Sequence, residues 1–169
     1  MPEPREHMQH RGVIETVLRH IPGFRGYLEK EYRRESDALQ REWLCDRLVR
    51  AKRCLDGYTR SLVDAAAIDA LPDCDRLRGR IDKVASRIRG AMKGYSGFFD
   101  LVTIDEALLD RVYQADANLV EWIDRFGGNL EHIAERKEAP SEVVSEMLGQ
   151  LEELEQAWDQ RADILKGLE

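Results

Sequence analysis

Hydrophobic residues recur along this chain at alternating spacings of three and four, and this pattern constrains the fold more than any other feature. Such an alternation places apolar side chains on one face of an α-helix, as in the seam of a coiled coil. Four separate series show it, each over several helical turns. They are Leu44, Leu48, Ala51, Leu55, Tyr58, Leu62 and Ala65; Leu77, Ile81, Val84, Ile88 and Ala91; Leu108, Val112, Ala115, Leu119, Trp122 and Phe126; and Val144, Met147, Leu151, Leu154, Trp158, Ala162 and Leu165.

Proline, glycine and capping residues mark the ends of these helices. Pro22-Gly23 separates a short N-terminal helix, about residues 11–20, from the long second helix, and Leu71-Pro72-Asp73 separates the second from the third. Thr103 and Glu106 form a capping-box pattern that predicts the start of the fourth helix. We expect Gly127-Gly128-Asn129 to break or end that helix. Pro140, a residue suited to a first helical turn, opens the last one.

The predicted fold is all-α: an antiparallel bundle of four main helices, including one very long second helix, with a short N-terminal helix. We expect residues 1–10 to form a polar tail and residues 11–169 a single helical-bundle domain. The second helix could span residues 25–68, roughly 65 Å at about 1.5 Å per residue, whereas the third is only about half as long. Either the second helix is broken, or its first half projects past the hairpin and residues 94–102 run extended along it.

Two short glycine–aromatic stretches precede long helices. GFRGY (23–27) and GYSGFF (94–99) both read Gly-aromatic-x-Gly-aromatic. In an up-down-up-down bundle the helices that follow them start at the same end, so we expect the stretches to meet. The rings could plug the end of the bundle or form a docking surface, and the sequence leaves both readings open. Aromatic and Arg side chains dominate interface hot spots, so the predicted partner-binding residues are Phe24, Arg25, Tyr27, Tyr32, Arg33, Arg34, Tyr95, Phe98 and Phe99.

The same region carries a family resemblance. The strings IPGFRGYLEKEYRRESD (21–37) and GYSGFFDLVTIDEALLDRVYQAD (94–116) resemble an uncharacterised prokaryotic family of small helical proteins. The resemblance implies that these stretches are family features. It implies no activity and supplies no catalytic residue.

No catalytic pattern stands out in the sequence. A di-iron bundle needs Glu-x-x-His on two helices, and none of the four histidines has a Glu three residues before it. Phosphate-loop, nucleophile-elbow and zinc-protease motifs are missing. The cysteines at positions 45, 54 and 74 have neither zinc-ligand nor disulfide spacing. We therefore expect a protein that is not an enzyme and carries no cofactor and no metal.

Charge is unevenly distributed along the chain. Residues 1–100 hold 20 Lys and Arg against 16 Asp and Glu, a net of +4, whereas residues 101–169 hold 6 against 17, a net of −11. The third helix carries a basic stripe, which we expect to face acids such as Glu146, Glu153 or Asp163, or an acidic protein. The overall charge of −7 and the lack of interleaved aromatics argue against nucleic acid. The stripe consists of Arg76, Arg80, Lys83 and Arg87.

These observations predict a cytoplasmic scaffold or adaptor that acts by protein–protein interaction, with self-association an option and no small-molecule substrate evident. The N-terminus lacks the pattern of a secretory signal, and no apolar run approaches the roughly 20 residues of a membrane-spanning helix. The alternative is a peripheral membrane protein. It would use the basic stripe and the apolar face of the N-terminal helix, formed by Val13, Ile14, Val17, Leu18 and Ile21.

Overall fold

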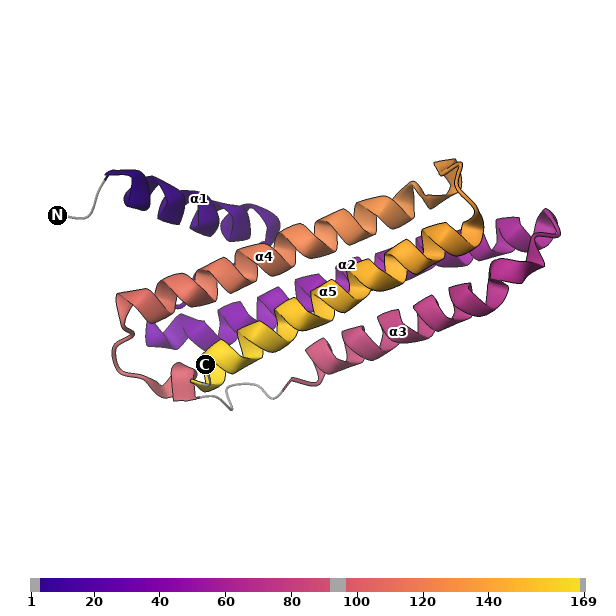
Figure 1. Ribbon diagram of the computed structural model, residues 1–169. Helices are drawn as coiled ribbons and strands as arrows, with labels where there is room; N and C mark the ends of the chain where they lie inside the picture. Colours follow the sequence, from indigo (N-terminus) through magenta and orange to yellow (C-terminus); the bar gives the residue numbers. More distant parts are fainter. Residues whose placement is uncertain (1–3, 92–96, 168–169) are drawn as a thin grey trace. The chain divides into compact units, whose positions relative to one another are not determined.

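The computed structural model describes residues 4–91 and 97–167, with side chains from residue 11 onwards. The fold is all-α, as the apolar series predict, and within the described ranges it has five α-helices and no strand (Figure 1). The helices are α1 (Pro4–His20), α2 (Lys30–Asp64), α3 (Leu71–Arg89), α4 (Glu106–Glu131) and α5 (Pro140–Lys166), with short 3-10 turns η1 (Ile68–Ala70), η2 (Gly97–Asp100) and η3 (Ile133–Glu135).

Several helix boundaries differ from the prediction. Helix α1 begins at Pro4, inside the segment expected to be a tail. Helix α2 starts at Lys30 rather than near residue 25, and it is continuous to Asp64, which answers the question of a break. Asp105, not Thr103, caps α4, because its carboxylate accepts a hydrogen bond from the Ala107 amide at 3.0 Å.

The glycine pair at 127–128 neither breaks nor ends α4, so that prediction is wrong. The helix runs through both glycines to Glu131. A Cβ on Gly127 would stand 3.2 Å from the Arg47 guanidinium, which lies against this turn and pairs with Asp124 at 2.8 Å. The glycine therefore makes room for an arginine of another helix rather than for a turn.

The chain divides into two compact units. Unit 1 comprises residues 1–43, 91–121 and 157–169, and unit 2 comprises residues 44–90 and 122–156. Helices α2, α4 and α5 each contribute residues to both units. The single domain over residues 11–169 stays a prediction.

Unit 2 is a bundle of four helical segments held by an apolar core and by polar contacts between neighbouring helices. Cys45 of α2 lies against the Ala85 carbonyl of α3, and farther along α2 Asp56 pairs with Arg78, nearer the start of α3, so these two helices run antiparallel. Asn129 of α4 contacts Gln150 of α5 at 2.9 Å. The α2–α3 connection bends at Ala66, which has a φ of 56°.

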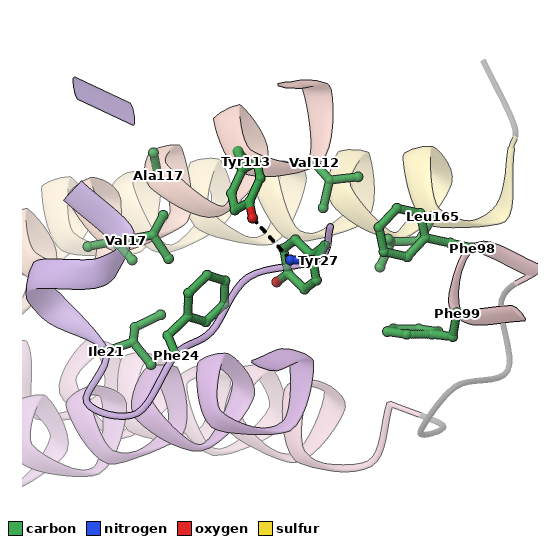
Figure 2. Close-up of a cluster of buried hydrophobic side chains, with 11 residues drawn as sticks. Val17, Ile21, Phe24, Tyr27, Phe98, Phe99, Val112, Tyr113, Ala117 and Leu165 are labelled. Carbon is green, nitrogen blue, oxygen red and sulfur yellow. Dashed lines mark hydrogen bonds between the residues drawn. The ribbon is translucent and has the colours of Figure 1, made fainter. Parts of the chain in front are cut away.

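Unit 1 is built on an aromatic-rich core in which the two glycine–aromatic stretches meet, as expected. Tyr27 and Phe98 stack edge to face with ring centroids 5.7 Å apart, and Phe24 packs on Tyr27 at 5.3 Å (Figure 2). Residues 97–100 form a 3-10 turn rather than an extended strip, and Tyr95 lies outside the described residues. The whole cluster is Val17, Ile21, Phe24, Tyr27, Phe98, Phe99, Val112, Tyr113, Ala117, Val120 and Leu165.

Gly26 holds the first stretch against α4. Its φ is +88°, and a Cβ there would overlap the Tyr113 hydroxyl. That hydroxyl accepts a hydrogen bond from the Tyr27 amide at 3.0 Å (Figure 2). A side chain at position 26 is therefore excluded both by the backbone conformation and by this contact.

We predict that Gly26→Ala lowers the free energy of unfolding by about 2–3 kcal/mol, from left-handed strain and loss of the Tyr113 hydrogen bond. Gly57→Ala is the matched control, because a Cβ there meets nothing within 4 Å inside α2. The control should gain about 0.5–1 kcal/mol. Urea titration followed by circular dichroism measures both, and equal effects of the two substitutions would contradict the role assigned to Gly26.

Candidate functional site

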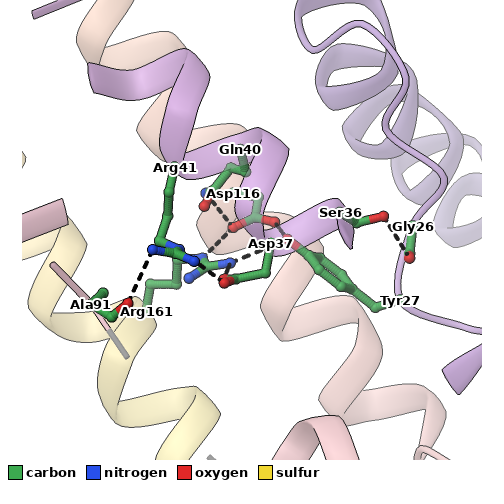
Figure 3. Close-up of polar contacts among 9 residues, drawn as sticks. All are labelled: Gly26, Tyr27, Ser36, Asp37, Gln40, Arg41, Ala91, Asp116 and Arg161. Atoms are coloured by element: carbon green, nitrogen blue, oxygen red, sulfur yellow. Dashed lines mark hydrogen bonds and ion pairs between the residues drawn. The ribbon is translucent and has the colours of Figure 1, made fainter. Parts of the chain in front are cut away.

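Unit 1 contains a buried network of charged and polar side chains beneath the aromatic core. Tyr27 reaches it from the first glycine–aromatic stretch, and Asp37, Gln40 and Arg41 come from successive turns of α2 (Figure 3). Asp116 of α4 and Arg161 of α5 complete it. All six side chains are buried, so the network is removed from bulk water.

Arg161 is the centre of this network. Its Nε donates to Asp116 Oδ1 at 2.5 Å, and its Nη2 donates to Asp37 Oδ1 at 2.8 Å and to the Tyr27 hydroxyl at 3.2 Å. Asp116 also accepts hydrogen bonds from the Tyr27 hydroxyl and from Gln40 Nε2, the latter at 2.6 Å. The other oxygen of Asp37 accepts from Arg41 Nε at 2.9 Å.

The network balances its own charge. Two carboxylates, Asp37 and Asp116, face two guanidiniums, Arg41 and Arg161. Burial raises the pKa of Asp116, and Arg161 opposes that rise without cancelling it. Burial alone would lower the pKa of Arg161, but Asp116, Tyr27 and Asp37 hold it well above its ordinary value. An arrangement of this kind requires one packing of the three helices, because each buried charge needs its partner within reach.

Arg33 is fully buried and forms a second polar centre, which we call the Arg33 clamp. It donates to four main-chain carbonyls: Tyr27 at 2.7 Å, Leu28 at 3.2 Å, Phe98 at 3.3 Å and Leu101 at 2.5 Å. Burial lowers the pKa of its guanidinium. The clamp thus ties residues 27–28 and 98–101, which are far apart in sequence, to the first turn of α2.

Three aliphatic side chains at or next to residues bound by the Arg33 clamp are exposed to solvent. Leu28, Leu101 and Val102 are 68%, 38% and 85% exposed, and we call them the clamp patch. Beside it Arg34 pairs with Asp100 at 2.7 Å and lies over the Phe99 ring. The patch therefore has fixed backbone beneath it and charged residues at its edge.

The predicted partner-binding residues divide between the interior and the surface. Phe24, Tyr27, Phe98 and Phe99 are buried in unit 1, as is Arg33, and Tyr95 lies outside the described residues. This burial favours the plug reading of the two stretches. Three residues keep exposed or partly exposed side chains beside the plug: Arg25, Tyr32 and Arg34.

Sequence reasoning missed the buried network, although a signal for it exists. Asp116 and Arg161 are buried. The apolar series of the sequence analysis had assigned the adjacent residues, Ala115 and Ala162, to the buried face of each helix. Asp116 is four residues after Val112 and three before Leu119, and Arg161 is three after Trp158. A charge of opposite sign at a seam position of each of two helices is the signature of a buried ion pair.

The basic stripe lies in unit 2 and meets a different acid from those expected. Arg80 pairs with Glu155 of α5, and Arg87 approaches the same carboxylate at 4.0 Å. Glu155 was not among the acids named from the sequence, and of those Glu146 pairs with Arg136 instead. The other two members of the stripe, Arg76 and Lys83, are exposed.

Among the described residues, no group of three or more His, Cys, Asp or Glu is placed to hold a metal ion. None of the helices in that part of the chain is long and apolar enough to cross a membrane.

Comparison with protein-family models, with curated proteins and with solved structures finds no match for this chain. The family resemblance of residues 21–37 and 94–116 stays an expectation.

We predict that Arg161→Met lowers the free energy of unfolding by about 3–5 kcal/mol, because it leaves two buried carboxylates without their shared cation. Gln160→Met, at the adjacent exposed position of α5, is the matched control and should change stability by less than about 0.5 kcal/mol. Chemical denaturation of both variants measures the difference. A small loss for Arg161→Met would mean that the network does not hold unit 1 together.

We predict that alkaline pH weakens the fold partly through Tyr27. Burial, followed by the charge of Asp116, raises the pKa of this phenol well above its ordinary 10.0. Above pH 10 the unfolded chain therefore loses a proton that the folded chain keeps, and stability falls as pH rises, by up to about 1.4 kcal/mol per pH unit for one group. Tyr27→Phe should be less stable at neutral pH but decline less steeply. Urea titrations between neutrality and pH 11 test this, and parallel slopes would contradict it.

Proposed function

We propose that this chain is a non-enzymatic helical module that works by binding another protein, and that the clamp patch is its docking surface. The observation that carries the proposal is the presence of three exposed aliphatic side chains, two of them on residues whose carbonyls are held by one buried arginine. The Leu28 and Leu101 carbonyls bind the same guanidinium and Val102 follows Leu101, so the three residues belong to one region, and a concentration of exposed apolar residues marks an interaction site more often than scattered ones do. The proposed location is the cytoplasm.

Fixed backbone favours binding because less conformational entropy is lost when a partner arrives. The Leu28 and Leu101 carbonyls are both held by Arg33, so the main chain beneath these two side chains is ordered before any contact forms. Val102 follows directly and is the most exposed of the three. The patch is thus organised in the isolated chain.

The flanking residues have the composition of an interface rim. Arg25 lies over the Tyr32 ring at 4.7 Å, and Arg34 pairs with Asp100. Arg and Tyr are enriched among residues that contribute most to binding. Arg25, Tyr32 and Arg34 are the predicted binding residues whose side chains remain at the surface, and they flank the exposed aliphatic side chains rather than the buried rings.

Two observations favour a binding module over the other classes considered. The ionisable groups of the buried network are engaged with one another, which is the arrangement of a structural ion-pair network. Four of the five residues on the apolar face of α1 are occupied, since Val17 and Ile21 are buried in the unit 1 core and Val13 and Ile14 pack against it, whereas Leu18 is 47% exposed. Membrane binding through that face would require α1 to leave the core.

We predict that Val102→Glu abolishes capture of a partner by the tagged chain from a lysate of its native source, measured by mass spectrometry. A buried charge at the centre of an interface opposes docking. Val63→Glu is the matched control, because Val63 is also an exposed valine, at 53%, but belongs to unit 2. Both variants should keep the wild-type circular dichroism spectrum. Equal capture by wild type and Val102→Glu would refute the proposal.

A further inference from the structure

Helix α4 carries a second apolar stripe beside the one that packs into the bundle. Tyr113, Ala117 and Val120 lie at spacings of four and three, and all three are buried. They belong to the same hydrophobic cluster as Val17 and Ile21 of α1 (Figure 2). A surface helix needs only one apolar stripe to join a bundle, so burial of a second stripe requires another element over it. In unit 1 that element is α1.

Helix α2 provides the other side of the surface that α1 covers. The Trp43 ring meets the His20 ring of α1 edge to face, with the two centroids 5.9 Å apart. Leu39, one turn earlier on α2, packs against the same hydrophobic cluster. We call this surface the α1 groove. It consists of Leu39 and Trp43 of α2 and of Tyr113, Ala117 and Val120 of α4.

The chain is fixed immediately after the turn that follows α1. The Arg25 amide donates to the Ser36 hydroxyl at 3.2 Å, and this hydroxyl donates to the Gly26 carbonyl at 3.0 Å. The turn itself contains Gly23, which has a φ of +80°. All residues of the buried network and of the Arg33 clamp come later in the chain. Helix α1 can therefore swing about this turn without breaking the contacts that hold α2, α4 and α5 together.

An aliphatic face seats α1 in its groove. Val17 and Ile21 are buried, and Val13 and Ile14 pack against the cluster. Three of these side chains follow one another at intervals of four residues. Proteins that bind a helix in a groove recognise apolar anchors at intervals of three and four residues. The requirement that α1 meets is thus a spacing of aliphatic side chains, which an amphipathic helix of another protein can also meet.

From this geometry we propose that the α1 groove is a second docking surface, that its partner is an amphipathic helix of another protein, and that α1 is the displaceable cover of the groove in the isolated chain. The inference goes beyond the proposed function, because the groove and the clamp patch have no residue in common. Val102→Glu should therefore leave binding in the groove unchanged, so the two proposals can fail separately.

Peptide binding to the full-length chain tests the inference. Val17→Glu places a charge on the buried face of α1 and should release the helix, whereas Leu18→Glu is the matched control because Leu18 is 47% exposed. A labelled peptide of residues 4–22 should bind the Val17→Glu chain about tenfold or more tightly than the wild type or the control, because a seated α1 competes for the groove. Fluorescence anisotropy measures the three affinities.

A second peptide distinguishes a general helix site from one that accepts α1 alone. It keeps Val13, Ile14, Val17 and Ile21 and replaces the exposed positions with other polar residues. It should bind the Val17→Glu chain within about threefold of the first peptide, since the anchors are unchanged. Failure of this peptide would restrict the groove to α1 and overturn the assignment of a partner. A wild-type dimer that Val17→Glu abolishes would assign the groove to α1 of a second copy instead.

Hydrogen exchange of the wild type provides a test that needs no variant. Amides of residues 12–20 should exchange about tenfold or more faster than those of residues 112–120, because α1 opens while the bundle stays closed. Equal exchange rates of the two segments would overturn the inference. So would a Val17→Glu chain that loses the circular dichroism spectrum of the bundle, or a folded one that binds neither peptide.

Discussion

The guanidinium of Arg161 is the group on which the arrangement of unit 1 depends. It connects α5 to α4 through Asp116, to α2 through Asp37 and to the first glycine–aromatic stretch through Tyr27. A charge buried this deeply is tolerated only where its partners are placed within hydrogen-bond distance. Shifting any of the three helices by one turn would strand a charge in the core, so the network selects one register where an apolar seam alone would accept several.

Arg33 plays a similar role for the segments outside the helices, where a buried guanidinium also fixes the chain through hydrogen bonds. Main-chain carbonyls that bend out of a helix or turn must find donors when they are buried. One side chain satisfies four of them, from two stretches about seventy residues apart, which is why these stretches can leave helical geometry next to an aromatic core. The rings of Tyr27 and Phe98 therefore lie inward in the aromatic core, whereas the clamp patch on the neighbouring residues of the same two stretches lies outward.

The spacing of apolar residues predicted the helices because periodicity is a local property. Pro72 and Pro140 predicted helix starts because the restriction that proline places on the backbone does not depend on the tertiary contacts around it. The meeting of the two glycine–aromatic stretches also followed from topology. The wrong or missing predictions concern contacts between helices. Gly127 has the composition of a helix end, but it makes room for Arg47 of another helix. The pairing of Asp116 with Arg161 could not be predicted without knowing which positions of α4 and α5 lie opposite each other. The exposure of Val102 could not be predicted from its neighbours in sequence, because it depends on where Arg33 binds the carbonyl of the preceding residue.

The Arg33 clamp also determines how this end of the chain can open. Amide exchange and proteolysis occur through local unfolding, and segments that share their stabilising contacts unfold together. Residues 27–28 and 98–101 draw on a single donor group, so releasing one stretch removes a fixed point of the other, and both glycine–aromatic stretches belong to one cooperative opening unit. Cleavage or modification of one stretch would thus also destabilise the other. The aromatic core between them would become exposed to solvent in one step rather than ring by ring.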